Sequence, residues 1–225
     1  MYEKIALSAH TIISGSTGSG KSVLMNNFLT ALIKLPAYQW QLWICDPKRV
    51  DYMDYKPLCR KYATEPAQID NLLQDAVNEM ERRYKYMMAA RDKEWMRDHI
   101  FIICDEFGQI LRSPKAVSAL DQLLRLGRAA RVHVIAANQN AARTNGCPSF
   151  LRVNFTAQVG LHCVDRIASR QATGFPGCEL LPLYGYAYCM TPQDTQPVLY
   201  QIDKKSDEEI KRQIADAIER KKKGE

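Results

Sequence analysis

The residues best suited to chemistry form a glycine-rich stretch near the start of this sequence. It reads Gly15-Ser16-Thr17-Gly18-Ser19-Gly20-Lys21-Ser22 and matches the pattern G-x-x-x-x-G-K-[ST]. Glycines let the backbone turn tightly and point successive N–H groups at one anion, and the positive end of a following helix adds to the attraction. In such a loop the lysine reaches the β- and γ-phosphates of a nucleotide, and the serine hydroxyl ligates Mg²⁺. The stretch therefore predicts a nucleotide-binding protein.

The residues on either side of this stretch fit a strand, a loop and a helix in that order. The apolar run 11–13 precedes it, and Val23, Leu24 and Met25 follow it. A phosphate-binding loop requires this context, whereas a flexible Gly/Ser linker does not. The linker interpretation is therefore the weaker one, and Val23 is included in the predicted nucleotide site.

A second candidate is the acidic pair Asp105-Glu106, which directly follows the apolar run 101–104. Ligands of open α/β sheets bind outside the carboxyl ends of the strands, so this pair is expected at the mouth of the sheet. In a nucleotide hydrolase the aspartate holds Mg²⁺ and the adjacent acid polarises the attacking water. Asp105 is therefore a predicted metal ligand and Glu106 a predicted catalytic residue. The alternative, a helix-capping acidic pair, loses weight beside the phosphate loop.

Further polar residues surround the next apolar run, 132–137. Gln139 closes that expected strand, where it could sense the γ-phosphate and orient water; the alternative is a solvated strand end. Arg128 and Arg131 precede the strand. An arginine supplied in trans would stabilise charge on the transferring phosphoryl group, but both could equally be ordinary cations at a helix C-terminus. His133, inside the strand, is expected to be a packed core histidine.

Short apolar runs alternate with amphipathic segments, which predicts an α/β fold with a mostly parallel central sheet flanked by helices. Glu79 and Arg83 lie one turn apart on the longest expected helix, where we expect a surface ion pair. No repeat or internal boundary is visible, so 1–225 is expected to form a single domain. The expected strands are 11–13, 40–45, 100–104, 132–137, 155–161, 184–190 and 198–202, the last two as a β-hairpin, and the expected helices are 20–34, 67–96, 115–130, 165–173 and 206–221.

Composition excludes few functions. The chain has 225 residues, of which 46% are hydrophobic and 25% charged, as in ordinary soluble domains. No apolar stretch approaches the ~18 residues of a transmembrane helix. Seven cysteines without a C-x-x-C pair indicate reduced, cytosolic thiols rather than a zinc site. The net charge of +6 is compatible with a polyanionic partner but is also common for ordinary surfaces.

Taken together, the motifs resemble the motor domain of the FtsK/SpoIIIE family of DNA translocases, in the family's order and over nearly the whole chain. The most specific string is Asn78-Glu-Met-Glu-Arg-Arg-Tyr84. The other marks are the phosphate loop, Asp46-Pro47-Lys48, Asp105-Glu106-Phe107, Arg128-Ala129-Ala130 with His133 and Gln139 behind it, and Ser169-Arg170 with Gly177 downstream.

This resemblance implies a RecA-like P-loop NTPase that hydrolyses ATP with Mg²⁺. It implies a homo-oligomeric ring, usually a hexamer, that pumps double-stranded DNA through a central channel. ATP then lies between neighbours, and Arg128 and Arg170 match family arginines that are candidates to complete the site. The chain departs from the family at Asn140-Ala141, where Arg-Pro is common, and at Gln158, where an arginine is usual. These departures concern how DNA is gripped rather than how ATP binds.

Two loops are candidates for DNA contact. One carries Arg112 and Lys115, and the other carries Arg143 and Asn145. Basic and amide side chains on loops suit the phosphate backbone and read no sequence; the alternative is that they are solvated loop charges. The family's membrane segments, linker and winged-helix module have no counterpart in this sequence. We therefore expect a cytoplasmic motor, either excised from a longer, membrane-tethered protein or a minimal translocase.

Two other functions stay open. A related ring ATPase of a conjugation or protein-secretion system would carry a similar domain, and a nucleotide-dependent scaffold would bind ATP without turnover. Intact Lys21, Ser22, Asp105 and Glu106 argue against the scaffold.

Overall fold

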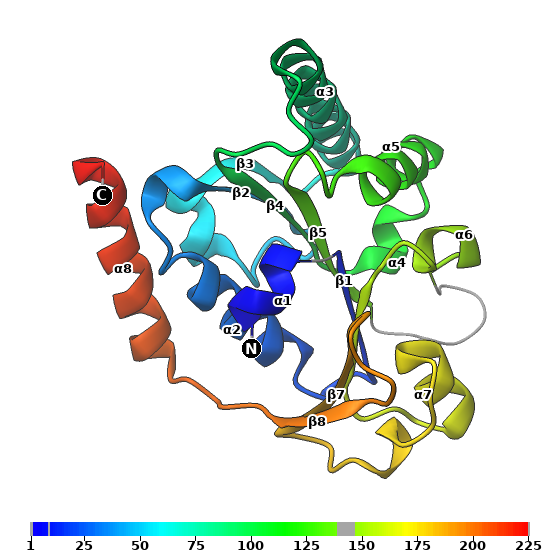
Figure 1. Ribbon diagram of the computed structural model, residues 1–225. Coiled ribbons are helices and arrows are strands. Elements are labelled where there is room, and N and C mark those ends of the chain that lie inside the picture. The colour runs from blue at the N-terminus through cyan, green and yellow to red at the C-terminus, as the bar shows by residue number, and fades with distance from the viewer. Residues whose placement is uncertain (1, 9, 139–146, 225) are drawn as a thin grey trace.

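The computed structural model of the protein describes residues 2–8, 10–138 and 147–224 (Figure 1). The elements in chain order are α1 Tyr2–Ser8, β1 Thr11–Ser14, α2 Lys21–Leu32, η1 Ala37–Gln39, β2 Trp40–Cys45, η2 Met53–Leu58, β3 Cys59–Ala63, α3 Pro66–Ala90, β4 His99–Cys104, α4 Phe107–Ile110, α5 Pro114–Leu126, β5 Val132–Asn138, α6 Ser149–Arg152, β6 Ala157–Gly160, α7 Arg166–Thr173, η3 Cys178–Leu180, β7 Tyr186–Met190, β8 Val198–Gln201 and α8 Asp207–Lys223.

Within the described residues, eight strands form one sheet in the order β3-β2-β4-β5-β1-β6-β7-β8. The six strands from β3 to β6 run parallel, and β7 and β8 are antiparallel additions at one edge. The predicted α/β class, the mostly parallel sheet and the C-terminal hairpin are therefore confirmed.

The register of the parallel strands brings their carboxyl ends to one edge of the sheet. Ser14 at the end of β1 lies opposite Asn138 of β5 and Gly160 of β6, and Cys104 at the end of β4 lies opposite Cys45 of β2. The loop after β1, the turn after β2 and the acidic pair after β4 all leave the sheet at this edge. Candidate functional residues that are far apart in the sequence thereby lie at one edge of the sheet.

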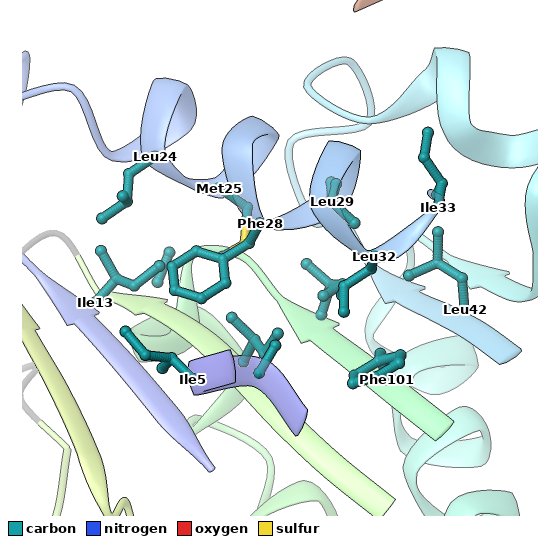
Figure 2. Packing of buried hydrophobic residues seen from close by; sticks show 14 of the residues in the cluster. Ile5, Ile13, Leu24, Met25, Phe28, Leu29, Leu32, Ile33, Leu42 and Phe101 are labelled. Carbon is teal, nitrogen blue, oxygen red and sulfur yellow. The ribbon is translucent and has the colours of Figure 1, made fainter. Parts of the chain in front are cut away.

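Two layers of helices cover the sheet because successive strand residues point to opposite faces. Ile13 of β1 packs in the cluster that contains α1, α2 and α8, whereas Ile12 packs in the cluster that contains α3, α5 and α6 (Figure 1). Figure 2 shows the first cluster, where side chains of α2, Phe28 among them, lie over Ile13 and Phe101. Each fully buried side chain of this size contributes about 1.5–3 kcal/mol to folding.

Two of the predicted helices end earlier than their apolar periodicity suggested. The helix expected to reach Met96 ends at Ala90, because Arg91 adopts the left-handed conformation (φ 59°) and its N–H caps carbonyls of the last turn. The helix expected to reach Ala130 ends at Leu126.

The sequence analysis also missed several elements. Strand β3 was missed because it is an edge strand whose residues are mostly half-exposed, so it lacks the apolar run of a central strand. The short helices α1, α4 and α6 carry too few turns to show a period. The strand expected over 155–161 is limited to Ala157–Gly160.

Arg83 corrects the expected surface ion pair. Its side chain is 0% exposed although its partner Glu79 is partly exposed. Its guanidinium donates to Glu79 at 3.0 Å, to the Asp98 carboxylate at 2.9 Å, and to the backbone carbonyls of Asp98 and Ala130 at 2.9 Å each. The ring of Trp95 lies against it, with 4.9 Å between ring centroid and guanidinium carbon. The loop between α3 and β4 therefore folds over this face of α3 and makes the arginine a core residue. His133, by contrast, is buried as predicted.

None of the helices in the described part of the chain combines the length and apolarity needed to cross a bilayer.

Candidate nucleotide site

The glycine-rich stretch forms a tight loop between β1 and α2, as its spacing predicts. Gly20 precedes the first residue of α2 in the left-handed conformation, with φ 94°, which glycine adopts without strain. A Cβ at Gly15 would lie 2.6 Å from the Ser19 hydroxyl oxygen and 2.8 Å from the Leu161 Cβ, so this position has no room for a side chain. Ser16 anchors the loop by donating its N–H and its hydroxyl to the His162 carbonyl, each at 2.9 Å. The loop is therefore held in shape by the segment after β6.

Lys21 lies at the N-terminus of α2 and folds back over the loop. Its ammonium donates to the carbonyls of Gly15 at 2.9 Å and Ser16 at 2.7 Å. Burial lowers the pKa of Lys21 to about 8, although the nearby charges of Glu106 and Asp105 oppose this shift. An arriving phosphate would favour the charged form and offer this ammonium a stronger hydrogen-bond acceptor than a carbonyl.

The acidic pair leaves β4 at the same edge. Asp105 is 6% exposed, its N–H donates to the Cys45 carbonyl at 3.2 Å, and its Oδ2 has no hydrogen-bond partner. Burial raises the pKa of Asp105 to about 6, against the opposing effect of Lys48. Glu106 adopts the left-handed conformation (φ 46°), which is uncommon for a residue with a side chain and is concentrated at functional sites.

Lys48 is one of the residues that the sequence analysis did not assign to the site. Its ammonium lies 2.6 Å from Glu106 Oε1, 3.4 Å from Asp51 Oδ2 and 3.8 Å from Asp105 Oδ2. The turn after β2 carries it, and buried Asp46 shapes this turn by accepting from the Arg49 N–H at 3.0 Å. The signal available in the sequence was its position, because Asp46-Pro47-Lys48 directly follows the strand 40–45. In the structure this strand pairs with β4, so the ends of both strands meet at one edge.

A pocket of about 580 Å³ joins these parts. Lys21, Ser22 and Asp105 all line it, so the predicted phosphate-binding and metal-binding side chains lie together. Its remaining walls are residues 17–20, Val23 and Lys48, together with Tyr184, Gly185, Ile202 and Lys204 from the two ends of the β7–β8 hairpin. The Ile202 N–H donates to the Gly185 carbonyl at 2.8 Å and closes the base of this hairpin. The contribution of the hairpin was not predicted.

The oxygen donors in the pocket fit a magnesium ion. Mg²⁺ prefers oxygen ligands and in nucleotide sites uses one or two protein groups beside the phosphates. Asp105 supplies a buried carboxylate oxygen without a hydrogen-bond partner, and Ser22 lines the same pocket with its hydroxyl. Among the described residues, no cluster of three or more His, Cys, Asp or Glu side chains is arranged to hold a metal. The pair Ser22 and Asp105 therefore suits an ion that the nucleotide itself helps to hold.

The remaining predicted residues lie apart from this pocket or outside the described residues. Arg128 is exposed just before β5, at the amino edge of the sheet and thus opposite the loop of its own chain. Arg170 is exposed on α7. Arg112 and Lys115 are exposed around the start of α5. Gln139, Arg143 and Asn145 lie outside the described residues.

The sequence comparisons give DNA translocases among the relatives of this chain. A sequence model of the FtsK/SpoIIIE family matches residues 1–101. The DNA translocase FtsK of Oceanobacillus iheyensis is 26% identical over 95% of this chain and 30% of its own length. SpoIIIE of Bacillus subtilis is 25% identical with the same coverage. FtsK of Chlamydia trachomatis is 28% identical over 97% of this chain and 31% of its own length. The chain therefore spans about a third of the length of these relatives.

Solved structures with the same fold include several ATPases. The pCW3 conjugation coupling protein TcpA, in its monomer form with ATPγS, superimposes with a TM-score of 0.81 and 19% identity over 94% of this chain and 65% of its own. ATPases 2 and 3 of EssC from Geobacillus thermodenitrificans also reach a TM-score of 0.81 at 19% identity, over 96% of this chain and 45% of theirs. At this identity the likeness shows a shared fold of the P-loop NTPase type. Together with the sequence relatives, it confirms that the chain resembles the motor domain of the FtsK/SpoIIIE family.

Proposed function

We propose that this chain is a motor domain that hydrolyses ATP with Mg²⁺ to move double-stranded DNA. The observation that carries the proposal is the pocket that Lys21, Ser22 and Asp105 line together. Glu106 contacts Lys48, which lines the same pocket. Phosphate binding, metal binding and water activation each require one of these groups, and the curated relatives that match over nearly the whole chain are DNA translocases.

The residues of this site have distinct tasks in the proposal. The backbone of the glycine loop and Lys21 bind the phosphates, and the hairpin wall formed by Tyr184 and Ile202 gives the base an apolar surface. Ser22 and Asp105 hold the magnesium ion, which when bound neutralises charge that develops on the phosphates. Glu106 orients the attacking water and accepts its proton. The lowered pKa of Lys21 and the raised pKa of Asp105 show that the pocket disfavours charge in both groups without ligand.

The ring and the DNA channel belong to the same proposal. Arg128 lies at the sheet edge opposite its own phosphate loop, so contact with a nucleotide would require the site of a neighbouring subunit. In a ring, such an arginine completes each neighbour's site. Exposed Arg112 and Lys115, together with Arg143 and Asn145, are the proposed backbone contacts to DNA. The proposal also includes a ring of six subunits and a single motor domain over residues 1–225.

ATP turnover measured with and without linear duplex DNA tests this function. We expect duplex DNA to stimulate turnover at low salt, where contacts to the phosphate backbone are strongest, and to stimulate it less as salt rises. Glu106→Gln is the matched control, because it retains the shape of the site but removes the proton acceptor; it should bind ATP without turning it over. Turnover that ignores DNA at low salt would contradict the DNA motor and favour a protein-secretion ATPase.

A further inference from the structure

Lys48 is a cation within a cluster of carboxylates, and the proposed reaction gives it no role. Three carboxylates converge on Lys48: Glu106 at 2.6 Å, Asp51 at 3.4 Å and Asp105 at 3.8 Å. The contact with Glu106 is short enough for a charge-assisted hydrogen bond. The carboxylate proposed to activate water is therefore bound to an ammonium group in the structure, and this contact occupies its Oε1 oxygen.

Lys48 and Lys21 belong to the lining of the same pocket, whose volume is about 580 Å³. Lys21 belongs to the loop that would hold the inner phosphates, whereas Lys48 lies beside the acidic pair. A terminal phosphate in contact with Lys21 would also come close to the acidic pair, where its negative charge would attract the Lys48 ammonium. Among the described residues, Lys48 is the cation within 4 Å of both of these carboxylates.

We propose that Lys48 senses the terminal phosphate: without nucleotide it holds Glu106, and with ATP bound it moves to the γ-phosphate and releases Glu106 to act on water. The inference rests on the proposed ATPase function and adds a residue to it. The side chain of Lys48 is 34% exposed, so the ammonium has room to exchange one anionic partner for another. A diphosphate does not extend to this position, so ADP would leave the pair of Lys48 and Glu106 intact. The site would thereby distinguish ATP from ADP and expose its proton acceptor only when a bond can be cleaved.

Binding of ADP and of the slowly hydrolysed analogue ATPγS tests the sensing step without relying on turnover. Lys48→Met should leave the affinity for ADP within about twofold and weaken ATPγS by about tenfold or more, the effect of losing one hydrogen bond between charged groups. Lys48→Arg keeps the charge and should restore most of the preference. Arg49→Met is the matched control, because Arg49 is the adjacent cation and pairs with Glu65 at 2.8 Å instead; it should alter neither affinity.

A second comparison covers the case in which Lys48→Met does not fold because its three carboxylates repel one another. The double variant Lys48→Met/Glu106→Gln removes both charges, and it is compared with Glu106→Gln alone, using ATP and ADP. The double variant should lose at least about tenfold of the ATP preference that Glu106→Gln retains. If the two variants prefer ATP equally, or if loss of Lys48 weakens ADP as much as ATP, Lys48 does not sense the third phosphate.

Thermal melting of the nucleotide-free protein tests the holding step. Lys48→Met should lower the melting temperature, and adding Glu106→Gln should recover more stability in the Lys48→Met protein than it adds to the wild type, because the first change leaves Glu106 uncompensated. Equal effects in both backgrounds would show that Lys48 does not hold Glu106. Should the wild-type protein bind neither nucleotide, the proposed function itself would fail, a result distinct from a selective failure of Lys48.

Discussion

Replacement of Arg83 by methionine is the sharpest test of how this fold is held together. The substitution keeps an unbranched apolar stem beside Trp95 and removes a guanidinium that is 0% exposed. It also leaves the Asp98 carboxylate and the carbonyls of Asp98 and Ala130 without the donor that each contacts at 2.9 Å. Removing one partner of a buried ionic network costs about 3–5 kcal/mol. In a domain of this size, 1 kcal/mol corresponds to about 2–4 °C in melting temperature, so we expect a decrease of roughly 10 °C.

Arg82→Met is the matched control for this measurement. Arg82 directly precedes Arg83 on α3 and contacts the same Glu79 at 2.7 Å, but its side chain is 60% exposed. An exposed ion pair contributes about 0–1 kcal/mol, so this variant should melt within about 4 °C of the wild type. Melting followed by circular dichroism at helix wavelengths compares the two. Equal losses of stability for both variants would show that the burial of Arg83 adds nothing to the stability that its charge provides.

Three further outcomes follow from the geometry. Lys21→Ala should abolish the ATP-dependent rise in melting temperature, which for the wild type should be roughly 5–10 °C at a hundredfold excess over Kd; an unchanged rise would refute the phosphate role. In mixtures with wild-type protein, Arg128→Ala should reduce ATP turnover non-linearly, since each altered subunit impairs its neighbour; a proportional loss would place this arginine outside the neighbour's site. Glu79→Gln should lower the melting temperature at pH 7. Hydrogen bonds from Arg82 and Arg83 hold the pKa of Glu79 below its ordinary value of 4.5, so the stability it contributes is present above that value and lost as pH falls. The melting temperatures of the two proteins should therefore converge as the pH falls below 4.5, and a gap that persists in strong acid would assign the effect to packing.

The phosphate loop and the acidic pair were predictable because their signals are local. A glycine loop between an apolar run and a helix specifies its own conformation, and Asp105 needs only a buried strand in front of it to reach the edge of the sheet. The central strands were predictable for the same reason, since central parallel strands read as continuous apolar runs. These features depend on residues within a few positions of one another.

The missed residues depend on contacts between distant segments. Lys48 enters the site because β2 pairs with β4 in a register that aligns Cys45 with Cys104, and no local pattern reveals that register. Tyr184 and Lys204 reach the pocket because the hairpin added beyond β6 returns past the phosphate loop. Arg83 looked like a surface residue because helical spacing alone cannot show that the loop after α3 covers it.

The difference between local and long-range contacts also affects how the site could be regulated. The groups proposed to bind phosphate and metal lie within a few residues of β1 and β4, so their placement depends on these strands and their loops. Lys48 reaches Glu106 only when β2 is seated beside β4, because the turn that carries it begins where β2 ends. The pairing of β2 with β4 is thus a condition for the contact between Lys48 and Glu106. A displacement of the turn that carries Lys48 should therefore alter the proposed turnover without a change in the phosphate loop.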